Sequence, residues 1–242
     1  ILNSKCFATL ANLDLSGNSV LVDAMDYSGL WATAFSDAVI QRSPFYDSFG
    51  HKIGSVDLMR VSRRVKMAYV STINAKVLEL PIGVDDRYRM LFALKLDTND
   101  IETIVKAIRS TIILEFMSKS RESYVSVDIG IPRFTMTSEI NVRSILENLG
   151  LTRLWTDPAV TRYISDPALV PSGFTQRVTI TLDNRGISPA SYVPETYNAS
   201  TGLEPVVGRD FIANRPFLFG LFDTETYTCL MTSIYSQPTY KY

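Results

Sequence analysis

Phe211-Ile212-Ala213-Asn214-Arg215-Pro216-Phe217-Leu218-Phe219 is the stretch of sequence that decides the fold of this chain. Residues 217–222 are almost all apolar, which is typical of a strand covered on both faces. Residues 187–210 come just before this stretch and show no sustained helical or strand period. Loops longer than about 15 residues are uncommon in compact domains and are usually functional or disordered. We therefore expect a functional loop over residues 187–210, followed by a buried strand.

The rest of the chain predicts strands and two helices that do not alternate regularly. We expect strands at residues 19–25, 76–80, 90–96, 123–129 and 178–182, with Pro81 ending the second of them. Asp100 can cap a helix whose buried face carries Ile101, Ile104, Val105, Ile108 and Ile112. Thr137 or Ser138 can cap another helix, which Gly150 ends. The irregular order of the elements favours an α+β fold over a doubly wound parallel sheet.

The composition bears on partners and on localisation. The chain has 242 residues, of which 46% are hydrophobic, and a net charge of −1. We therefore expect no binding of nucleic acid and no membrane span. The two cysteines, Cys6 and Cys229, are expected to be buried thiols rather than a disulfide. The chain starts at Ile1 without a recognisable leader peptide, so its localisation stays open, with extracellular and virion-associated as the two locations considered.

The residue patterns of common enzymes and metal sites are missing from the sequence. The only histidine, His51, lies in the turn-like segment 49–52, which leaves no zinc site of the usual spacing. No Gly-x-Ser-x-Gly elbow, phosphate-binding loop or dinucleotide fingerprint is present. Asp97, Asn99 and Asp100 resemble part of a calcium loop, but Glu102 stands where that loop needs glycine, so a helix cap explains them better. We expect no enzymatic activity, no cofactor and no metal.

Short segments along nearly the whole chain match one known family in order and spacing. Residues Leu21-Val22-Asp23-Ala24-Met25, Gly29-Leu30-Trp31 and Phe35 resemble a serpin strand and the turn after it. Ile131-Pro132-Arg133-Phe134 and Leu149-Gly150-Leu151 are similar to the serpin Pro-Lys-Phe strand and Leu-Gly-Met turn. Gly186 matches the glycine that opens the reactive-centre loop, residues 211–219 the signature after it, and Pro238 the proline that closes the last strand. By this resemblance the chain is identified as a member of the serpin family.

The resemblance implies the serpin fold, which is α+β with a large central mixed sheet, smaller sheets and helices. Residues 1–242 would form the C-terminal portion of a single serpin domain, with residues 187–210 as its reactive-centre loop. The family's N-terminal helices and first strands are not represented, so we expect the missing N-terminal segment of the same protein to be a partner. The departures from the family motifs suggest a rapidly diverging relative, such as a virus-encoded one.

The resemblance also implies a suicide mechanism, in which a protease attacks the loop and the cleaved loop inserts as a new strand of the large sheet. The hinge that must insert first is Gly186-Ile187-Ser188-Pro189-Ala190, and it departs from the small residues that this step needs. Ile187 and Tyr192 are bulky, and Pro189 and Pro194 lack the backbone donor of an interior strand. A ladder bond left unmade in a buried site costs roughly 1–3 kcal/mol. We therefore expect insertion to fail.

Two functions follow from this expectation. The first is a non-inhibitory serpin-fold protein that acts by binding a protein partner or as a structural component. The alternative is a suicide-type inhibitor of a non-trypsin-like serine or cysteine protease. Counting from Gly186 and from Pro216 places the scissile bond among Ser200, Thr201, Gly202, Leu203, Glu204 and Pro205, none of which is basic.

Three further positions are assigned by the same resemblance, and one by a motif. Trp31 matches the tryptophan at the top of the large sheet, the breach of the family. Asp23 and Gln176 replace an asparagine and a histidine of its shutter, and these two side chains can share a hydrogen bond. Asn198-Ala199-Ser200 is an acceptor sequon for glycosylation.

Overall fold

The computed structural model describes residues 19–25, 29–32, 40–85, 87–97, 101–107, 115–116, 124–162, 170–188 and 210–241. The chain divides into two compact units. Unit 1 consists of Ile1–Tyr27 and Thr135–Ile180, and unit 2 consists of Ser28–Phe134 and Thr181–Tyr242.

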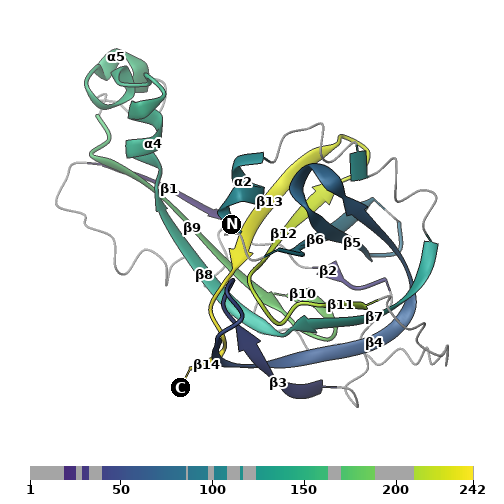
Figure 1. Cartoon of the computed structure of the whole chain (residues 1–242). Coiled ribbons are helices and arrows are strands. Elements are labelled where there is room, and N and C mark those ends of the chain that lie inside the picture. The colour runs from purple at the N-terminus through teal and green to yellow at the C-terminus, as the bar shows by residue number, and fades with distance from the viewer. Residues whose placement is uncertain are drawn as a thin grey trace. The chain divides into compact units, whose positions relative to one another are not determined.

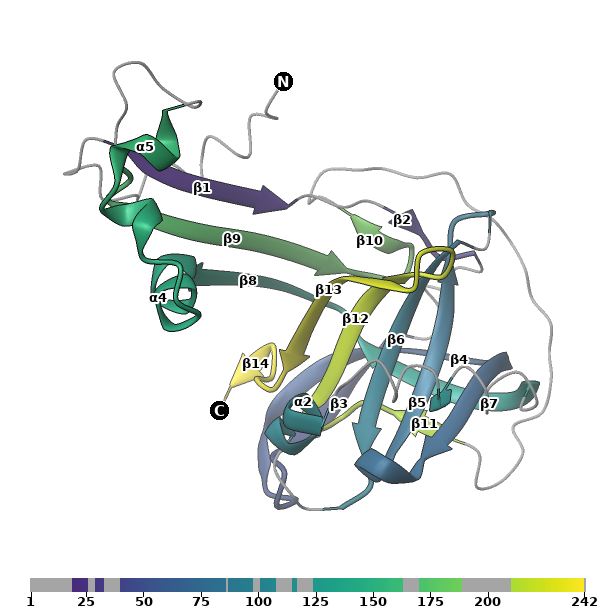
Figure 2. The same cartoon turned by 90° about the horizontal axis from the view of Figure 1, so that it is seen from above.

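A nine-stranded sheet forms the framework of unit 2. Its strand order is β11-β7-β4-β5-β6-β12-β13, and β3 and β14 also pair with β4 (Figure 1). The strands are β3 (Ile40–Tyr46), β4 (Lys52–Val70), β5 (Ala75–Ile82), β6 (Tyr88–Lys95), β7 (Tyr124–Pro132), β11 (Asp210–Ile212), β12 (Phe217–Asp223), β13 (Thr228–Tyr235) and β14 (Tyr240–Lys241). Figure 2 shows β6, β12 and β13 running side by side, as their pairing requires.

The remaining described elements of unit 2 are short. They are the strands β2 (Gly29–Leu30) and β10 (Gly186–Ser188), the 3-10 helix η2 (Ser71–Ile73) and the helix α2 (Glu102–Ala107). Ile104 of α2 is fully buried, together with Phe116, against small apolar residues of the sheet such as Val70 and Ala75. This packing covers the part of the sheet that carries these residues.

A second group of buried residues in unit 2, apart from the cluster around Ile104, is aromatic. Phe92 of β6 and Phe217 and Phe219 of β12 have no exposed surface. The rings of Phe134 and Tyr235 stack with their centroids 4.6 Å apart. The prediction of a strand buried on both faces after residue 210 is confirmed by β12, whose residues Phe217–Leu221 are all buried.

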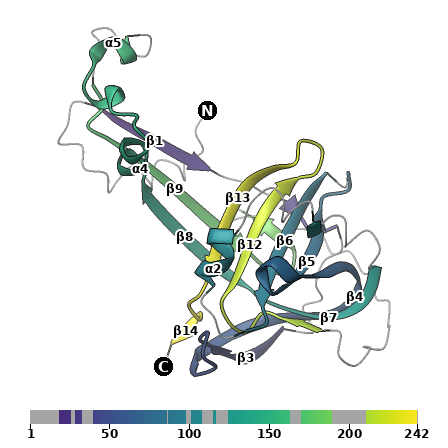
Figure 3. The same cartoon turned by 45° about the horizontal axis from the view of Figure 1, so that its top comes forward.

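Unit 1 holds strands with helical segments at one of their ends. Its strands are β1 (Val20–Met25), β8 (Phe134–Asn141) and β9 (Gly173–Leu182), and its helical elements are α4 (Val142–Asn148), η3 (Arg153–Trp155) and α5 (Pro158–Thr161). β1 pairs with β9 in parallel, and β8 pairs with β9 as well. The helices gather at one end of the strands (Figure 3). The last residues of β9, Thr181 and Leu182, and the first residue of β8, Phe134, belong to unit 2.

The structure corrects two predicted helix and strand limits. The cap of α4 is Asn141, whose side chain accepts a hydrogen bond from the backbone N–H of Ser144, and not Thr137 or Ser138. These two residues belong to β8, where exposed and half-buried positions alternate. Asp100, the predicted cap of the other helix, lies outside the described residues.

Pro81 does not end its strand, because β5 continues to Ile82. β4 pairs with β5 only as far as Glu79, so Pro81 lies where β5 has lost that neighbour and pairs with Arg89 of β6. On that side, within the described residues, β5 meets only the short segment at Trp31 and Ala32, where the backbone N–H of Ala32 donates to the carbonyl of Pro81 at 3.0 Å, and a proline is tolerated at such an irregular end of a sheet. Cys229 is an exposed free thiol, so the prediction of burial is wrong for it, and Cys6 lies outside the described residues.

Candidate functional site

The first residues of the predicted loop are a strand between two others. In β10, Gly186 and Ile187 pair with Leu30 and Gly29 of β2, and on the other side Ile187 and Ser188 pair with Leu182 and Thr181 of β9. Both pairings are antiparallel. Gly186–Ser188 is the part of the predicted hinge, residues 186–190, that the structure describes, and "the hinge" below means these three residues.

A tight turn between β9 and β10 positions the hinge. The backbone N–H of Asp183 donates to the carbonyl of Gly186 at 3.0 Å, and Gly186 donates back at 3.3 Å. The Asp183 side chain accepts from the backbone N–H groups of Arg185 at 2.8 Å and Gly186 at 3.2 Å. The chain therefore reverses within four residues, which aligns β10 with β9.

Gly186 is required at its position. It has a φ of +151°, and a Cβ atom there would lie 2.1 Å from the carbonyl oxygen of Gly29 and 2.8 Å from the Cα of Leu30. Both obstacles are backbone atoms of β2, so they cannot turn aside as a flexible side chain would. The close approach of β10 to β2 thus depends on glycine.

Trp31 holds the turn from the side of β2. Its indole Nε1–H donates to the carbonyl of Asp183 at 2.9 Å, and its backbone N–H donates to that of Arg185 at 2.8 Å. Trp31 also forms an isolated bridge with Ile82 of β5, and only 5% of its surface is exposed. Both donors of one residue therefore fix the turn that leads into the hinge.

The expectation that bulky residues keep the segment after Gly186 out of the sheet is wrong for Ile187. Ile187 is paired on both sides and only 2% exposed. Its partner on one side is Gly29, which has no side chain, and on the other it is Leu182, which is fully buried. Gly29 contributes no side chain on one side of Ile187, and Leu182 contributes an apolar one on the other. The branched apolar side chain of Ile187 therefore fits between the two strands.

The predicted hydrogen bond between the two shutter positions is present in unit 1. Asp23 of β1 and Gln176 of β9 are register partners in the parallel pair, and Gln176 Nε2 donates to Asp23 Oδ2 at 2.5 Å. Pairing between the two strands runs from Val20 with Gly173 to Met25 with Val178. The role of the Asp23–Gln176 bond in opening the sheet stays a prediction.

The other predicted loop positions lie outside the described residues. They are Pro189, Ala190, Asn198, Ser200, Thr201, Gly202, Leu203, Glu204 and Pro205. The chain is described again from Asp210, where β11 pairs in parallel with β7. Phe211 of β11 is fully buried.

Asp210 ties the start of β11 to β5. Lys76 Nζ donates to the backbone carbonyl of Asp210 at 2.9 Å and to its Oδ1 at 3.0 Å. The Asp210 side chain is 57% exposed. β11 is therefore held by its pairing with β7, by the buried side chain of Phe211 and by one surface ion pair.

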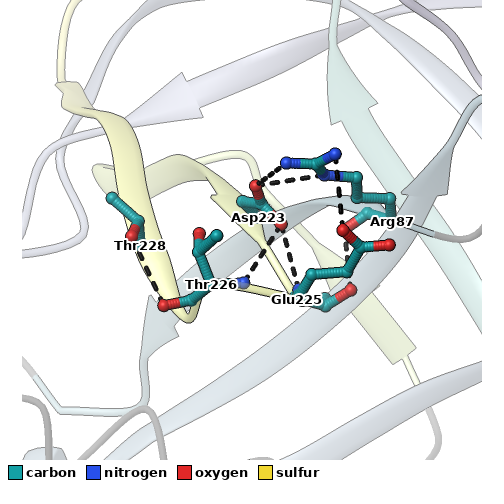
Figure 4. A network of polar contacts seen from close by, with 6 residues as sticks. Arg87, Asp223, Glu225, Thr226 and Thr228 are labelled. Carbon is teal, nitrogen blue, oxygen red and sulfur yellow. Dashed lines mark hydrogen bonds and ion pairs between the residues drawn. The ribbon is translucent and has the colours of Figure 1, made fainter.

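A polar network joins Arg87, just before β6, to the turn of the β12–β13 hairpin (Figure 4). Arg87 Nη2 bonds Asp223 Oδ2 at 2.7 Å and Arg87 Nη1 approaches Glu225 Oε2 at 3.3 Å. Asp223 Oδ1 accepts from the backbone N–H of Glu225 at 3.0 Å. The hydrogen bond from Arg87 lowers the pKa of Asp223 to about 2, against the opposing effect of burial. The network therefore ties the start of β6 to the turn of the hairpin.

No group of three or more histidine, cysteine, aspartate or glutamate residues able to hold a metal ion occurs in the described part of the chain. In the same part, no helix has the length and hydropathy needed to cross a membrane.

Sequence reasoning did not identify Gly29, Leu182 and Asp183 as parts of the hinge site. The signal for the turn was available, since Asp183-Asn184-Arg185-Gly186 follows an alternating strand, and aspartate at the first and glycine at the fourth position are typical of a type I turn. The partner strand β2 gave no such signal, because two residues are too few to show a period.

Comparison with known proteins agrees with this geometry. The family model described as Serpin (serine protease inhibitor) matches residues 4–238. Antitrypsin of Bombyx mori is 26% identical over 84% of this chain and 51% of its own length. Human Serpin I2 is 28% identical over 90% of this chain and 53% of its own length. The chain therefore spans about half the length of these curated relatives.

The chain is also similar to a relative of about its own length and to a solved structure. Ovalbumin-related protein X of Gallus gallus is 26% identical over 94% of this chain and 97% of its own length. The crystal structure of Manduca sexta Serine protease inhibitor (Serpin)-12 is 21% identical and superposes with a TM-score of 0.71 over 93% of this chain and 58% of that one. The fold is thus that of a serpin, and with a family match over nearly its whole length, the chain belongs to the serpin family.

Proposed function

We propose that this chain is a portion of a non-inhibitory serpin, which binds a protein partner through the loop 187–210 and does not trap proteases. The observation that carries the proposal is the register of the hinge on β9. Ile187 lies opposite Leu182 and Ser188 opposite Thr181, so each later residue would fall one position further back along β9. In a fully inserted loop, Pro189 would lie opposite Ile180 and Pro194 opposite Thr175.

The two prolines would weaken both sides of the new strand. Gly186 donates its N–H toward Asp183, on the β9 side, and the donors of a strand alternate in direction. The missing N–H of Pro194 would therefore face β9, and that of Pro189 would face the opposite neighbour. Each unmade bond in a buried sheet costs roughly 1–3 kcal/mol, so insertion loses one bond on each flank.

Insertion must also separate a pair of strands that are already hydrogen-bonded. Residue 191 would fall opposite Val178, and from that point β9 is bonded to β1 as far as Gly173. The hydrogen bond between Asp23 and Gln176 lies within this stretch. A loop with two proline defects is slow to open such a pair, and slow insertion allows the protease to hydrolyse the acyl-enzyme and leave.

Mixing the protein with a panel of serine and cysteine proteases tests the proposal. We expect cleavage in the loop without a complex that survives boiling in detergent, and no rise in melting temperature after cleavage. In the double variant Pro189→Ala/Pro194→Ala we expect such a complex or a higher melting temperature after cleavage. Pro205→Ala is the matched control, because it removes a proline from the far half of the loop. A detergent-stable complex of the unmodified protein would refute non-inhibitory function.

The alternative function, inhibition of a non-trypsin-like serine or cysteine protease, has one observation in its favour. Ile187 already occupies the sheet, and residues 189, 191 and 193 would follow it on the same face as Pro, Ser and Val. Bulky Tyr192 would then point to the opposite face. Relatives named Antitrypsin and Antichymotrypsin-2 of Bombyx mori carry inhibitor names. Under this alternative, chymotrypsin-like or elastase-like proteases would be trapped by cleavage among residues 200–205, while trypsin would not.

We also propose that another segment of the same protein completes the domain. Ile145 and Leu149, at the end of unit 1, are 47% and 73% exposed, and such apolar surface is normally covered. The shared length with Serpin I2 is only 53% of that relative. Hydrogen exchange along α4 should slow when residues 1–242 are produced together with the upstream segment of the protein. Unchanged exchange would contradict this assignment.

A further inference from the structure

Side chains from β3, from the segment between β7 and β8, and from β14 meet around one buried carboxylate of unit 2. The carboxylate belongs to Asp57 of β4, which is 8% exposed. Arg42 Nε donates to its Oδ1 at 3.1 Å, and Arg133 Nη2 donates to its Oδ2 at 3.3 Å. The hydroxyl of Tyr240 donates to Oδ2 at 3.0 Å. We call Arg42, Asp57, Arg133 and Tyr240 the arginine cluster.

The arginine cluster carries more positive than negative charge. Burial raises the pKa of the Asp57 carboxyl, but the hydrogen bonds from its three partners outweigh burial and hold that pKa below its usual value. Asp57 therefore stays ionised and offsets one of the two arginines that pair with it. Exposed Lys241 adds a further positive charge. The network around Arg87 has the opposite balance, because that single arginine faces both Asp223 and Glu225.

The two arginines of the cluster are ordered and still reach solvent. Their side chains are 57% exposed for Arg42 and 49% exposed for Arg133. The guanidinium of Arg42 also stacks on the ring of Tyr240, with its Cζ 3.6 Å from the ring centroid. A guanidinium has several N–H donors, and the bonds to Asp57 use one group of each arginine. A second anion would meet side chains that are already ordered, which lowers the entropic cost of binding.

Close packing holds the aromatic ring on which Arg42 stacks. β14 pairs with β4, with Tyr240 opposite Ser55 and Lys241 opposite Gly54. A Cβ atom at Gly54 would lie 2.3 Å from the carbonyl oxygen of Tyr240 and 2.5 Å from Cγ of Pro238. The segment that carries Tyr240 therefore lies directly on the backbone of β4, and the arginine cluster is built on the sheet rather than on a loop.

We infer that the arginine cluster is a docking site for an acidic segment of a protein partner, whose carboxylate Arg42 and Arg133 bind. Guanidinium groups match carboxylates in planar geometry, and arginine and tyrosine are enriched where interfaces concentrate their binding energy. The excess of positive charge favours an acidic segment over a neutral or basic one. The inference goes beyond the proposed function, because this partner contact lies outside the loop 187–210.

Binding of a labelled acidic peptide tests the site. The protein is residues 1–242 produced together with the upstream segment, and the probe is fluorescein-labelled hexaglutamate, with hexaglutamine as the neutral peptide. Fluorescence anisotropy should show binding of hexaglutamate alone. Arg42→Gln should weaken it roughly tenfold, and Arg42→Lys, which keeps the charge without the planar fork, should weaken it less. Arg153→Gln is the matched control, because it removes the same charge from a one-to-one pair with Asp157 and should change the affinity by less than about twofold.

A second measurement locates the peptide without any substitution. Phenylglyoxal modifies accessible arginine side chains, and mass spectrometry follows the modification of each arginine in one sample. Saturating hexaglutamate should slow the modification of Arg42 and Arg133 severalfold and leave the rate at Arg153 unchanged. If Arg42→Gln lowers the melting temperature, this protection in the unmodified protein decides.

The outcomes are distinct from those of the proposed function. Absence of hexaglutamate binding, or equal affinities of the unmodified protein, Arg42→Gln and Arg153→Gln, would overturn the docking site. Displacement of the peptide by inorganic phosphate at the same total charge would assign the cluster to small anions and would also overturn a protein partner. A detergent-stable protease complex would refute the non-inhibitory function alone, since the arginine cluster is separate from the loop.

Discussion

The two ends of the loop are held in different ways. β10, at the start, is an interior strand with antiparallel neighbours on both sides, and its fixation depends on apolar burial and on the absence of a side chain at Gly186. β11, at the end, pairs with β7 alone, in parallel, and adds an exposed ion pair between Lys76 and Asp210. We call the contacts of β10 the first anchor and those of β11 the second anchor. The first anchor therefore depends on the fit between backbone and side chains, whereas charge contributes to the second.

This difference indicates which anchor responds to which change. A shape-dependent anchor is lost when an atom is added, because the obstacles at Gly186 are backbone atoms. A charge-dependent anchor is weakened by salt, because exposed ion pairs are screened. What the two anchors share is one fully buried or nearly buried apolar side chain, Phe211 in β11 and Ile187 in β10.

The largest effect is expected from Phe211→Ala. Phe211 has no exposed surface, and replacing a buried phenylalanine by alanine costs about 3–5 kcal/mol through lost burial and the cavity left behind. Urea unfolding would measure the loss. Phe49→Ala is the control, because Phe49 is 74% exposed and its removal should change stability little. A small loss at Phe211 would mean that β11 contributes little to the fold and that the comparison of the two anchors fails.

Gly186→Ala should break the first anchor and leave the second intact. The added Cβ would come within 2.1 Å of the carbonyl oxygen of Gly29, and such strain costs about 1–3 kcal/mol or expels the strand. Hydrogen exchange should then quicken at residues 187 and 188 and not at residues 210–212. Gly173→Ala serves as the control, since nothing lies within 4 Å of its added Cβ. Unchanged exchange at the hinge would show that β2 can move aside.

Acid should destabilise the protein through the Arg87–Asp223 pair, which belongs to neither anchor. Arg87 lowers the pKa of Asp223 to about 2, below the value of about 3.9 in an unfolded chain. The stability that this carboxylate contributes is therefore fully present above about pH 4 and is lost as the pH falls toward 2. We expect Asp223→Asn to flatten the fall in melting temperature between pH 4 and pH 2. Parallel acid curves for the variant and the unmodified protein would remove Asp223 as the cause.

Features of the molecule that depend on local pattern could be predicted from the sequence, and features that depend on neighbours could not. The continuous apolar run of β12 and the alternation in β9 are properties of single strands, and both were predicted. The place of Ile187 depends on Gly29, about 160 positions earlier in the chain, whose missing side chain makes the room. Pro81 was misread for a related reason, because only the sheet order shows that β4 no longer accompanies β5 there.

The same distinction explains the helix cap and the shutter pair. Thr137 is a good cap by residue type, but its segment alternates between exposed and half-buried positions and so forms β8. The bond between Asp23 and Gln176 was predicted because the resemblance placed both residues at sites that face each other in the family. The geometry confirms that bond, while its role in opening the sheet still needs experiment.

The smallest effect is expected at the ion pair of the second anchor. Lys76→Ala removes the bonds to the carbonyl and carboxylate of Asp210, and an exposed pair of this kind contributes less than about 1 kcal/mol. Hydrogen exchange should therefore quicken slightly at residues 210–212, and 1 M salt should reproduce the effect in the unmodified protein because it screens the pair. Hydrogen exchange at residues 187 and 188 should not change with Lys76→Ala or with 1 M salt, since Ile187 is held by apolar burial. If salt loosened the two ends equally, charge would hold the hinge as well, and the contrast between a shape-dependent and a charge-dependent anchor would disappear.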